Sequence, residues 1–435
     1  MDGKLYRNDL FCNKAKSLVV ACFLTAALSG LMGCQSDSDS ESSPVAPTLS
    51  YTEESSNSEE IPSSSVPPES SSEPSSSSEA TPPSSSLLPE SSSSEPSSSS
   101  EEDYSSSSSQ PESSEAQPES YAVVDGITFL VDSSFFMEKF HSSSIKIAFN
   151  DDETSELNYI EIDGNTIKHE IIPTSGAPNH PQFSPDGSKL AFSTGYEGFP
   201  QLSELFVIDL ASTERSTYKL DIESAAVPRW RILENGDTVI QYNDFTGSNR
   251  DFRWATSGTF LVTYSNNSFG TPQKILNRSY NGGVSSDNSL AVTGAQKLIF
   301  HYTTDDDSVN IDMYNDEQVC NVSLSRDTSK IISFLDARGS KGTEFTQDQN
   351  YYWHQYVFYM DQSGEIVKAI RADGGYVFNG TEWLFIPGYQ VSTITAMDGL
   401  SQSIVLIDYE QGSYNIILNA PEKEIIYPDL WVDEH

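Results

Sequence analysis

Residues 121–435 alternate hydrophobic and polar positions in short runs, which Gly, Asp, Asn and Ser separate from one another. A period of two residues is typical of β-strands, because successive side chains of a strand point to opposite faces of the sheet. We find no convincing amphipathic helix in this region, so the sequence predicts an all-β domain. The clearest unit, residues 180–220, predicts four strands at Gln182–Ser184, Lys189–Ser193, Leu205–Leu210 and Ser216–Leu220.

A tight turn joins the first two strands of this unit. Pro185 presets its own φ for the turn, and Gly187 accepts the positive φ that a β-branched residue would resist. Ser184 and Asp186 lie in the same turn. We therefore interpret Ser184 as a turn residue and not as a nucleophile.

The unit closely resembles the repeat of TolB-like β-propellers, in which a Pro–x–aromatic–Ser–Pro–Asp–Gly segment precedes a Lys–hydrophobic–Ala–Phe strand. The matching residues are Pro181, Phe183, Ser184, Pro185, Asp186, Gly187, Lys189, Leu190, Ala191 and Phe192. The resemblance implies four-stranded blades arranged around a central axis. It bears on the fold alone, because nothing here corresponds to the α/β domain that precedes the propeller of TolB itself.

Weaker copies of the unit follow at intervals of 38 to 56 residues, one of which keeps Ser286, Asp287 and Leu290. Four strands with their turns need about 40 residues, so this spacing predicts six blades, with seven as the alternative. The first blade, which begins at residues 144–150, lacks a good innermost strand, whereas the segment 428–432 has no blade of its own. We expect this C-terminal segment to complete the first blade and remove the exposed edge of an open sheet.

Residues 1–33 have the pattern of a secretory signal peptide, with four basic residues before an apolar run at 18–32. The run is short for crossing a bilayer, which takes about 18 to 20 apolar residues. It ends at Gly33 and Cys34, and this junction resembles the lipobox of bacterial lipoproteins. The resemblance implies diacylglycerol on the Cys34 thiol and cleavage before it. An ordinary signal peptide with a chance cysteine and an uncleaved anchor helix are the alternatives.

Gln35 follows the cysteine of this junction. In enteric lipoproteins an Asp at this position signals retention in the inner membrane. By analogy, the resemblance implies an outer-membrane lipoprotein, attached to the membrane through its lipid and facing either the cell surface or the periplasm.

The segment 34–120 consists almost entirely of Ser, Glu and Pro, with 18 acidic residues and no Lys, Arg or His. It cannot bury enough apolar surface to offset the entropy of ordering its backbone, so we predict a disordered tether. The predicted domain at 121–435 is also acidic, with 20 Lys and Arg against 44 Asp and Glu. Such a charge argues against nucleic-acid partners and leaves cationic and neutral partners open.

Catalytic and metal-binding motifs do not stand out from the sequence, which contains neither a GxSxG elbow nor an HExxH pair. Cys320 is the one cysteine of the predicted domain, and we interpret it as a small buried hydrophobe. His180 could face the central channel, although a structural or solvated role is the preferred interpretation. The acidic loops 151–153 and 305–307 are candidates for Ca²⁺, but solvated loops are the preferred interpretation, and we predict no cofactor.

Tyr351, Tyr352 and Trp353 form an aromatic run in one of the two longest loops within the repeats. Long propeller loops often carry function, and exposed aromatic rings stack on sugars. These three residues are therefore candidates for ligand binding, with packing between blades as the alternative.

The sequence as a whole predicts a lipid-anchored cell-envelope protein with a non-catalytic propeller that binds a protein or polysaccharide partner. The alternative is a carbohydrate-active enzyme of the lyase type, because some lyases resemble TolB-like propellers. A peptidase-type propeller is a weaker third hypothesis, since the chain contains no α/β-hydrolase sequence.

Overall fold

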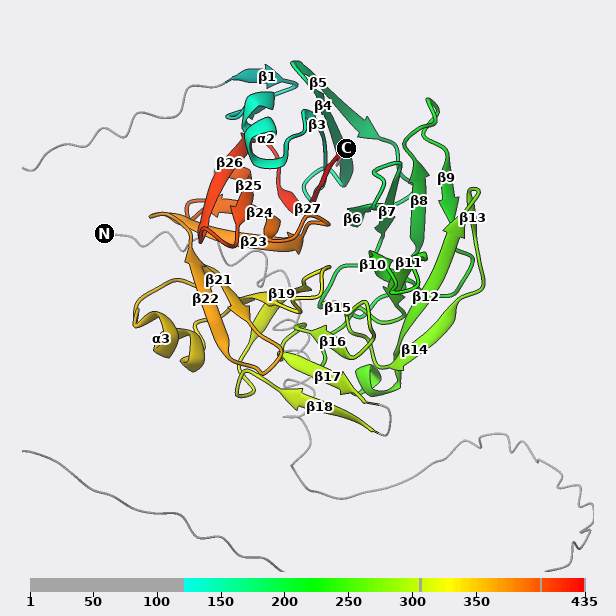
Figure 1. Ribbon diagram of the computed structural model, residues 1–435, viewed down its shortest axis with the longest axis vertical. Helices are drawn as coiled ribbons and strands as arrows, with labels where there is room; N and C mark the ends of the chain where they lie inside the picture. The colour runs from blue at the N-terminus through cyan, green and yellow to red at the C-terminus, as the bar shows by residue number, and fades with distance from the viewer. Residues whose placement is uncertain (1–120, 305–306, 400, 434–435) are drawn as a thin grey trace, which may run out of the picture. The chain divides into compact units, whose positions relative to one another are not determined.

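The computed structural model of this protein describes residues 121–304, 307–399 and 401–433. Within these residues, six antiparallel sheets are arranged radially as the blades of a β-propeller (Figure 1). The predicted fold class and the count of six blades are confirmed. The signal peptide, Cys34 and the linker at 34–120 lie outside the described residues, as do Asp305, Asp306 and His435.

Blades two to five each consist of consecutive strands that run from the centre outward. Blade two contains β6 (Asn179–Phe183), β7 (Lys189–Ser193), β8 (Leu205–Asp209) and β9 (Thr217–Lys219). Blade three contains β10 (Ala226–Ile232), β11 (Thr238–Asn243), β12 (Gly258–Ser265), β13 (Ser268–Phe269) and β14 (Gln273–Asn277). Blade four contains β15 (Gly283–Val284), β16 (Leu290–Thr293), β17 (Ile299–Thr303) and β18 (Ser308–Asp312). Blade five contains β19 (Val319–Leu324), β20 (Ile332–Asp336), β21 (Tyr356–Met360) and β22 (Ile366–Arg371).

The two ends of the described chain close the ring. Blade one contains β27 (Ile425–Val432), β3 (Ser144–Asp151), β4 (Glu156–Asp163) and β5 (Thr166–Ile172). Its innermost strand β27 comes from the C-terminal segment and pairs with β3, which confirms the predicted closure. Blade six contains β23 (Tyr376–Trp383), β24 (Tyr389–Ala396), β25 (Gln402–Asp408), β26 (Ser413–Asn419) and the N-terminal hairpin of β2 (Ile127–Phe129) and β1 (Ala122–Val124).

Two short α-helices, α2 (Ser133–Phe140) and α3 (Ser340–Thr346), correct the expectation that no helix is present. Asp132 caps α2 by accepting hydrogen bonds from the backbone N–H groups of Ser134 and Phe135, and Phe136 is buried beneath the helix. Helices of eight and seven residues are too short to show a clear amphipathic period. Within the described residues, no helix combines the length and the apolar character that a membrane crossing requires.

The Ser–x–Asp turn recurs between the first two strands of three blades. In blade two, Ser184 Oγ donates to Asp186 at 2.5 Å and accepts from the Lys189 N–H at 3.0 Å. Ser285 has the same two contacts in blade four, so Ser285 and not Ser286 is the equivalent of Ser184. In blade five Ser325 accepts from the Ile331 N–H. The motif therefore fixes turn geometry, as predicted.

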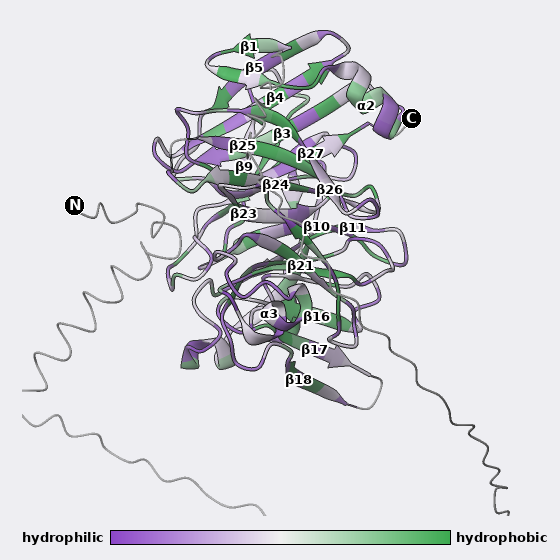
Figure 2. Cartoon of the chain, turned by 90° about the vertical axis from the view of Figure 1, so that its left-hand side faces the viewer, coloured by the Kyte–Doolittle hydropathy of each residue, from purple (hydrophilic) through white to green (hydrophobic). Residues whose placement is uncertain are grey.

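The hydrophobic core lies between neighbouring blades, and Figure 2 shows the hydrophobic segments within the strands. Phe183 of blade two packs against Tyr159 of blade one in one such cluster. Gly187 illustrates how closely these blades approach, since a Cβ atom on it would lie 2.3 Å from the Trp431 ring. Its φ of 63° also confirms the positive φ predicted for the turn.

The ring has two chemically different faces. The innermost strand of each blade ends on one side of the ring, where a turn leads into the second strand. We call this side the turn face. The opposite side is the loop face, which carries the connections between the second and third strands. The end of β27 and α2 lie together at the turn face (Figures 1 and 2).

Candidate binding site in the central channel

Five of the six innermost strands carry a β-bulge close to the loop face. Each bulge contains one residue with a positive φ, namely His180, Val227, Asn321, Gly380 and Tyr427. For a β-branched residue such as Val227 this conformation costs about 1 to 3 kcal/mol, so the surrounding structure must enforce it. Bulges re-aim side chains and are common next to functional sites. The residue two positions after each of these positive-φ residues is polar and buried. These five channel residues are Gln182, Arg229, Ser323, Glu382 and Asp429.

Arg229 and Glu382 form an ion pair across the channel, because blades three and six stand opposite each other in a ring of six. The two N–O distances are 2.5 and 2.8 Å, and the side chains are only 9% and 10% exposed. Ser323 Oγ also donates to Glu382 at 2.9 Å, and Arg229 Nε donates to the Asn281 carbonyl at 2.7 Å. This bidentate, fully hydrogen-bonded pair divides the channel into a loop-face end and a turn-face end.

A second ion pair joins Arg326 to Asp429 at 3.4 Å. Arg326 also donates to Gln182 Oε1 at 3.1 Å, and the Phe183 N–H donates to Asp429 at 2.7 Å. Burial raises the pKa of Asp429 to about 6, although Arg326 opposes this shift. Both acids of the channel wall thus have a guanidinium partner.

A cavity of about 120 Å³ occupies the loop-face end of the channel. Its lining combines hydrogen-bonding and aromatic groups, including Glu197, Phe199, Gln296, Cys320, Asn321, His354, Asn379 and Tyr427. Cys320 is half-buried at this cavity, which corrects its interpretation as a buried core residue. The cavity is large enough for several water molecules or one small polar group.

Glu197 is the acid of this cavity. Burial raises the pKa of its carboxyl to about 7, while Arg229 lowers that pKa and Glu382 adds to the rise. The Asn281 side-chain amide donates a hydrogen bond to the carboxyl. Near neutral pH the group is therefore divided between its protonated and ionised forms, so it can both donate and accept a hydrogen bond.

Two histidines at the same end are held neutral. Burial lowers the pKa of His354 to about 4, and burial together with Arg229 lowers the pKa of His180 to about 3. Among the described residues, the Nε2 atoms of both rings are buried without a hydrogen-bond partner. The His180 ring stacks on Tyr427 with centroids 3.7 Å apart. Buried polar atoms normally have partners, so these two atoms are exceptions within the described structure.

The loops around the cavity are tied to one another through their backbones. The Gly198 N–H donates to the Thr246 carbonyl at 2.7 Å, which links the loops of blades two and three. The Asn249 N–H donates to Ala295, which links blade three to blade four. These bonds hold the rim in one arrangement before any partner arrives, and such preorganisation lowers the entropic cost of binding.

The predicted aromatic run Tyr351–Trp353 lies on this rim, in the loop that contains α3. Tyr351 is fully buried and its hydroxyl donates to Asp336 at 2.7 Å, so its ring holds the loop in place. Tyr352 and Trp353 are 60% and 40% exposed and keep their place as candidate ligand-binding residues.

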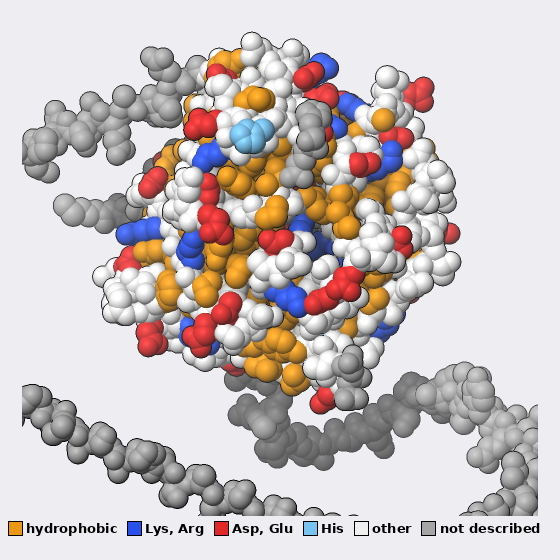
Figure 3. All heavy atoms as spheres, in the orientation of Figure 1, with side chains coloured by type: hydrophobic (Ala, Val, Ile, Leu, Met, Phe, Trp, Pro, Cys, Tyr) orange, Lys and Arg blue, Asp and Glu red, His pale blue; other side chains and the backbone are white. Residues whose placement is uncertain are grey.

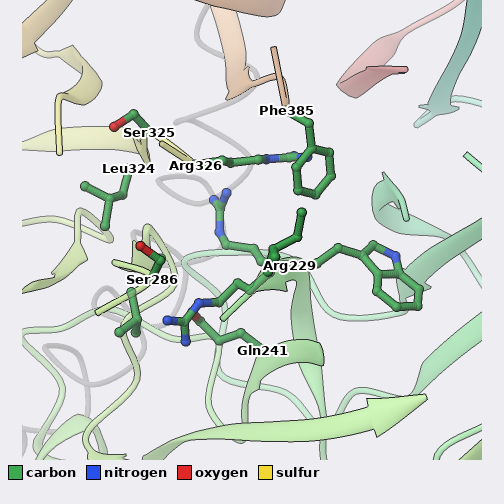
Figure 4. Close-up of a pocket in the computed structure, with 12 residues that line it drawn as sticks. Arg229, Gln241, Ser286, Leu324, Ser325, Arg326 and Phe385 are labelled. Atoms are coloured by element: carbon green, nitrogen blue, oxygen red, sulfur yellow. The ribbon is translucent and has the colours of Figure 1, made fainter. Parts of the chain in front are cut away.

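The turn-face end of the channel has the opposite chemistry. Figure 3 looks onto this face, where hydrophobic side chains surround the centre of the ring. A cavity of about 50 Å³ lies there, and three arginines line it, Arg229, Arg231 and Arg326. Figure 4 shows Arg326 extending over the ring of Phe385, and its guanidinium lies 4.3 Å from the ring centroid.

The candidate calcium loops show internal contacts where the structure describes them. Asp151 is buried, accepts from the backbone N–H groups of Glu153 and Glu424, and pairs with Lys423 at 3.3 Å. In the described part of the chain, no three His, Cys, Asp or Glu side chains are placed to hold a metal ion. Asp151 is thus not solvated as expected, and calcium binding stays the untested alternative for these loops.

Sequence reasoning did not single out Glu197, Arg229, Glu382 or Asp429. Glu197 lies in a loop without a motif, and Arg229 and Glu382 are 153 residues apart in the chain. One feature of the sequence could have identified some of the buried polar residues of the innermost strands. Three innermost strands have a proline immediately before the channel residue, in the dipeptides Pro181–Gln182, Pro228–Arg229 and Pro428–Asp429.

No protein-family model matches this chain, and no curated protein is significantly similar to it in sequence. Among solved structures, hydrazine synthase of Kuenenia stuttgartiensis is similar with 8% identity and a TM-score of 0.44, over 69% of this chain and 48% of that chain. A chain of a nidogen/laminin complex is similar with 9% identity and a TM-score of 0.43, over 67% of this chain and 99% of that chain. Oligogalacturonate lyase of Vibrio parahaemolyticus has 10% identity and a TM-score of 0.33, over 63% of this chain and 72% of that chain. The chain thus spans about half of the hydrazine synthase chain, and identities this low bear on the fold alone.

Proposed function

We propose that this protein is a lipid-anchored cell-envelope protein whose propeller binds a protein or glycan partner through its loop face, without catalysis. One observation carries the proposal. Five large hydrophobic side chains are exposed on the loops of this face: Leu202 (72%), Phe252 (82%), Phe345 (43%), Tyr352 (60%) and Trp353 (40%). They lie in the connections between the second and third strands of blades two, three and five, on the same face of the ring as the cavity that Glu197 lines.

Exposed hydrophobic groups are common at binding surfaces, and ligand pockets are typically apolar with a few polar groups that orient the ligand. The pocket supplies hydrogen bonds from neutral groups and from Glu197, whereas the rim supplies apolar contact area. Aromatic and large hydrophobic residues contribute most of the binding energy at such surfaces. The acidic composition of the domain favours a cationic or neutral partner.

The anchor is proposed from the sequence, because Cys34 lies outside the described residues. Two or three acyl chains give a stable attachment, at about 0.8 kcal/mol per buried methylene. Palmitate labelling of the wild type and of Cys34→Ala tests this part. Label on the wild type alone supports the anchor, and label that persists in Cys34→Ala overturns it.

The binding proposal is tested by capturing envelope proteins and glycans with the full chain and with the double variant Tyr352→Ala/Trp353→Ala. The matched control is Val309→Ala/Ile311→Ala, since these residues are 48% and 42% exposed on the outer strand β18. We expect the loop-face variant to lose at least tenfold in affinity and the control to bind as the wild type does. Equal binding by both variants would contradict the proposal.

A second candidate function rests on Glu197. A carboxyl with a pKa of about 7 in a cavity is suited to general acid–base chemistry, which a carbohydrate lyase would require. Turnover of oligogalacturonides or other polymers, abolished by Glu197→Gln, would favour the enzyme. Saturable binding without product, retained in Glu197→Gln, would favour the binding protein.

A further inference from the structure

The three arginines at the turn-face end differ in what neutralises them. Arg229 pairs with Glu382, and Arg326 pairs with Asp429. Arg231 takes part in none of the ion pairs of the described residues, although it is only 8% exposed. A buried guanidinium without a counter-ion is costly, because burial removes the water that would otherwise solvate its charge.

The hydrogen bonds of Arg231 leave one side of its guanidinium unused. Nη2 donates to the Ser285 carbonyl and to Asn288 Oδ1, the latter at 3.1 Å. Nη1 is buried and has no hydrogen-bond partner in the described structure. The nearby carboxylate of Asp287 opposes the lowering of the Arg231 pKa by burial, but its direct ion pair, at 2.6 Å, is with Lys330.

The space at this position suits a small anionic group. The cavity that Arg231 lines measures about 50 Å³, which is more than the roughly 30 Å³ that one water molecule occupies in the liquid. Ser286 and Ser325 also line it. Nη2 already uses both of its hydrogens on Ser285 and Asn288, so a carboxylate at this position would accept from Nη1 and supply the negative charge that Arg231 lacks in a direct ion pair.

Phe385 is shared by this cavity and a larger groove on the same face. It lines the arginine cavity and also a groove of about 330 Å³ that Leu384, Ile386 and Trp431 line. A ligand whose carboxylate reaches Arg231 would therefore find aromatic and aliphatic surface next to it. This arrangement favours an organic acid with an apolar body over a bare inorganic anion.

We infer that the turn-face end of the channel is a binding site for the carboxylate group of a small organic acid, with Arg231 as the cation that holds it. The site lies on the other side of the Arg229–Glu382 pair from the loop-face cavity. It does not depend on the function proposed for the loop face.

Thermal unfolding of the full chain in the presence of phenylacetate tests this site, with phenylacetamide as the neutral isostere and acetate as the carboxylate without a ring. All three are titrated at constant ionic strength. We expect phenylacetate to raise the melting temperature, acetate to do so with at least tenfold lower affinity, and phenylacetamide to have no effect. Arg231→Gln should abolish the response to phenylacetate, and Arg231→Lys should weaken it, because lysine keeps the charge but has no second nitrogen to hold Ser285 and Asn288 while the first binds the ligand.

The matched control is Arg371→Gln, which removes a guanidinium that is 54% exposed on the outer strand β22. This variant should respond to phenylacetate as the wild type does. The unliganded melting temperature of Arg231→Gln shows in the same experiment whether the variant folds. An equal response of Arg231→Gln and the wild type would overturn the inference, as would the absence of any response in the wild type or an equal response to phenylacetamide.

Discussion

The two ends of the central channel are separated by one ion pair and have opposite chemistry. The loop-face end contains a carboxyl, Glu197, whose pKa is raised to about 7, and two neutral histidines. The turn-face end contains three arginines, of which Arg231 has no carboxylate partner among the described residues. The loop-face end is rimmed by long loops with exposed hydrophobic residues, whereas short Ser–x–Asp turns surround the other end.

The difference shows how a repeated scaffold produces two distinct sites. Each of the six blades supplies one innermost strand, and five of these strands carry a bulge at an equivalent position. The asymmetry comes from single residues at equivalent positions, such as Arg229 in one blade and Glu382 in the opposite blade. It also comes from the loops, whose length varies freely because they do not take part in the blade sheets.

The largest effect is expected from breaking the pair that separates the ends. Glu382→Gln leaves the Arg229 guanidinium buried without its counter-ion, so we expect the free energy of unfolding to fall by about 3 to 5 kcal/mol. Urea denaturation of the full chain measures this change. Glu204→Gln is the control, because the Lys219–Glu204 pair is 46% exposed on both sides and its loss should cost at most about 1 kcal/mol. Equal losses in the two variants would show that the pair does not hold the channel together.

A smaller effect is expected at the loop-face rim. Tyr351→Phe removes a buried hydrogen bond to the Asp336 carboxylate, which should cost about 1.5 to 3 kcal/mol. Tyr352→Phe, at the exposed neighbouring position, should change stability by less than about 0.5 kcal/mol. Urea denaturation measures both changes. A larger loss of unfolding free energy in Tyr352→Phe than in Tyr351→Phe would contradict the structural role that we assign to the Tyr351 ring.

The pH dependence of stability tests the raised pKa of Glu197 at the loop-face end of the channel. Because the pKa of Glu197 rises from its usual 4.5 to about 7 on folding, the folded state binds more protons than the unfolded state between these values. Its contribution to stability is therefore complete below pH 4.5 and is lost as the pH rises through 7. Between pH 5 and pH 8 we expect the free energy of unfolding of Glu197→Gln to fall by roughly 1 to 2 kcal/mol less than that of the wild type, because solvent at the cavity mouth screens part of the effect.

Melting temperatures of the wild type and Glu197→Gln at pH 5 and pH 8 measure this difference. Glu410→Gln, which changes an exposed glutamate, is the control and should leave the pH dependence unchanged. Parallel pH profiles for the wild type and Glu197→Gln would mean that the carboxyl does not titrate in the way that its burial implies.

The smallest effect is expected at Arg231. Arg231→Gln loses hydrogen bonds to Ser285 and Asn288, but it also relieves the burial of a charge without a counter-ion. We therefore expect the free energy of unfolding to change by less than about 1 kcal/mol, in contrast to the large cost of breaking the central pair. Denaturation in urea without added carboxylate measures it. A loss as large as that of Glu382→Gln would assign Arg231 a structural role.

The fold could be predicted from one complete turn motif and the spacing of its weaker copies. Residues 180–220 predicted the four consecutive strands of a blade. The segment 428–432, which has no blade of its own, predicted that the C-terminal strand completes blade one. The alignment of individual blades was less accurate. The weaker copy in blade four was aligned through Ser286, whereas Ser285 holds the place of Ser184. In blade six, Trp383 stands after the bulge at Gly380 where Phe183 stands after the bulge of blade two. A bulge inserts one residue without a sequence signal, because residues as different as His180 and Gly380 adopt its positive φ.

The candidate site could be predicted only in part. The aromatic run lies in a connection on the loop face, but its pattern did not show that Tyr351 is buried and Tyr352 exposed. The channel residues were missed because each is a single polar side chain in an otherwise ordinary strand. Their role arises only when the ring brings opposite blades together, as it does for Arg229 and Glu382.

Photo-crosslinking in living cells tests most directly the claim that the loop face receives the partner. p-Benzoylphenylalanine replaces Tyr352 on the loop face in one variant and Ile232 on the turn face in another, since these residues are 60% and 47% exposed. The account predicts that the variant at position 352 forms a discrete covalent adduct with an envelope protein or glycan, and that the variant at position 232 does not. An adduct from position 232 without one from position 352 would contradict the account.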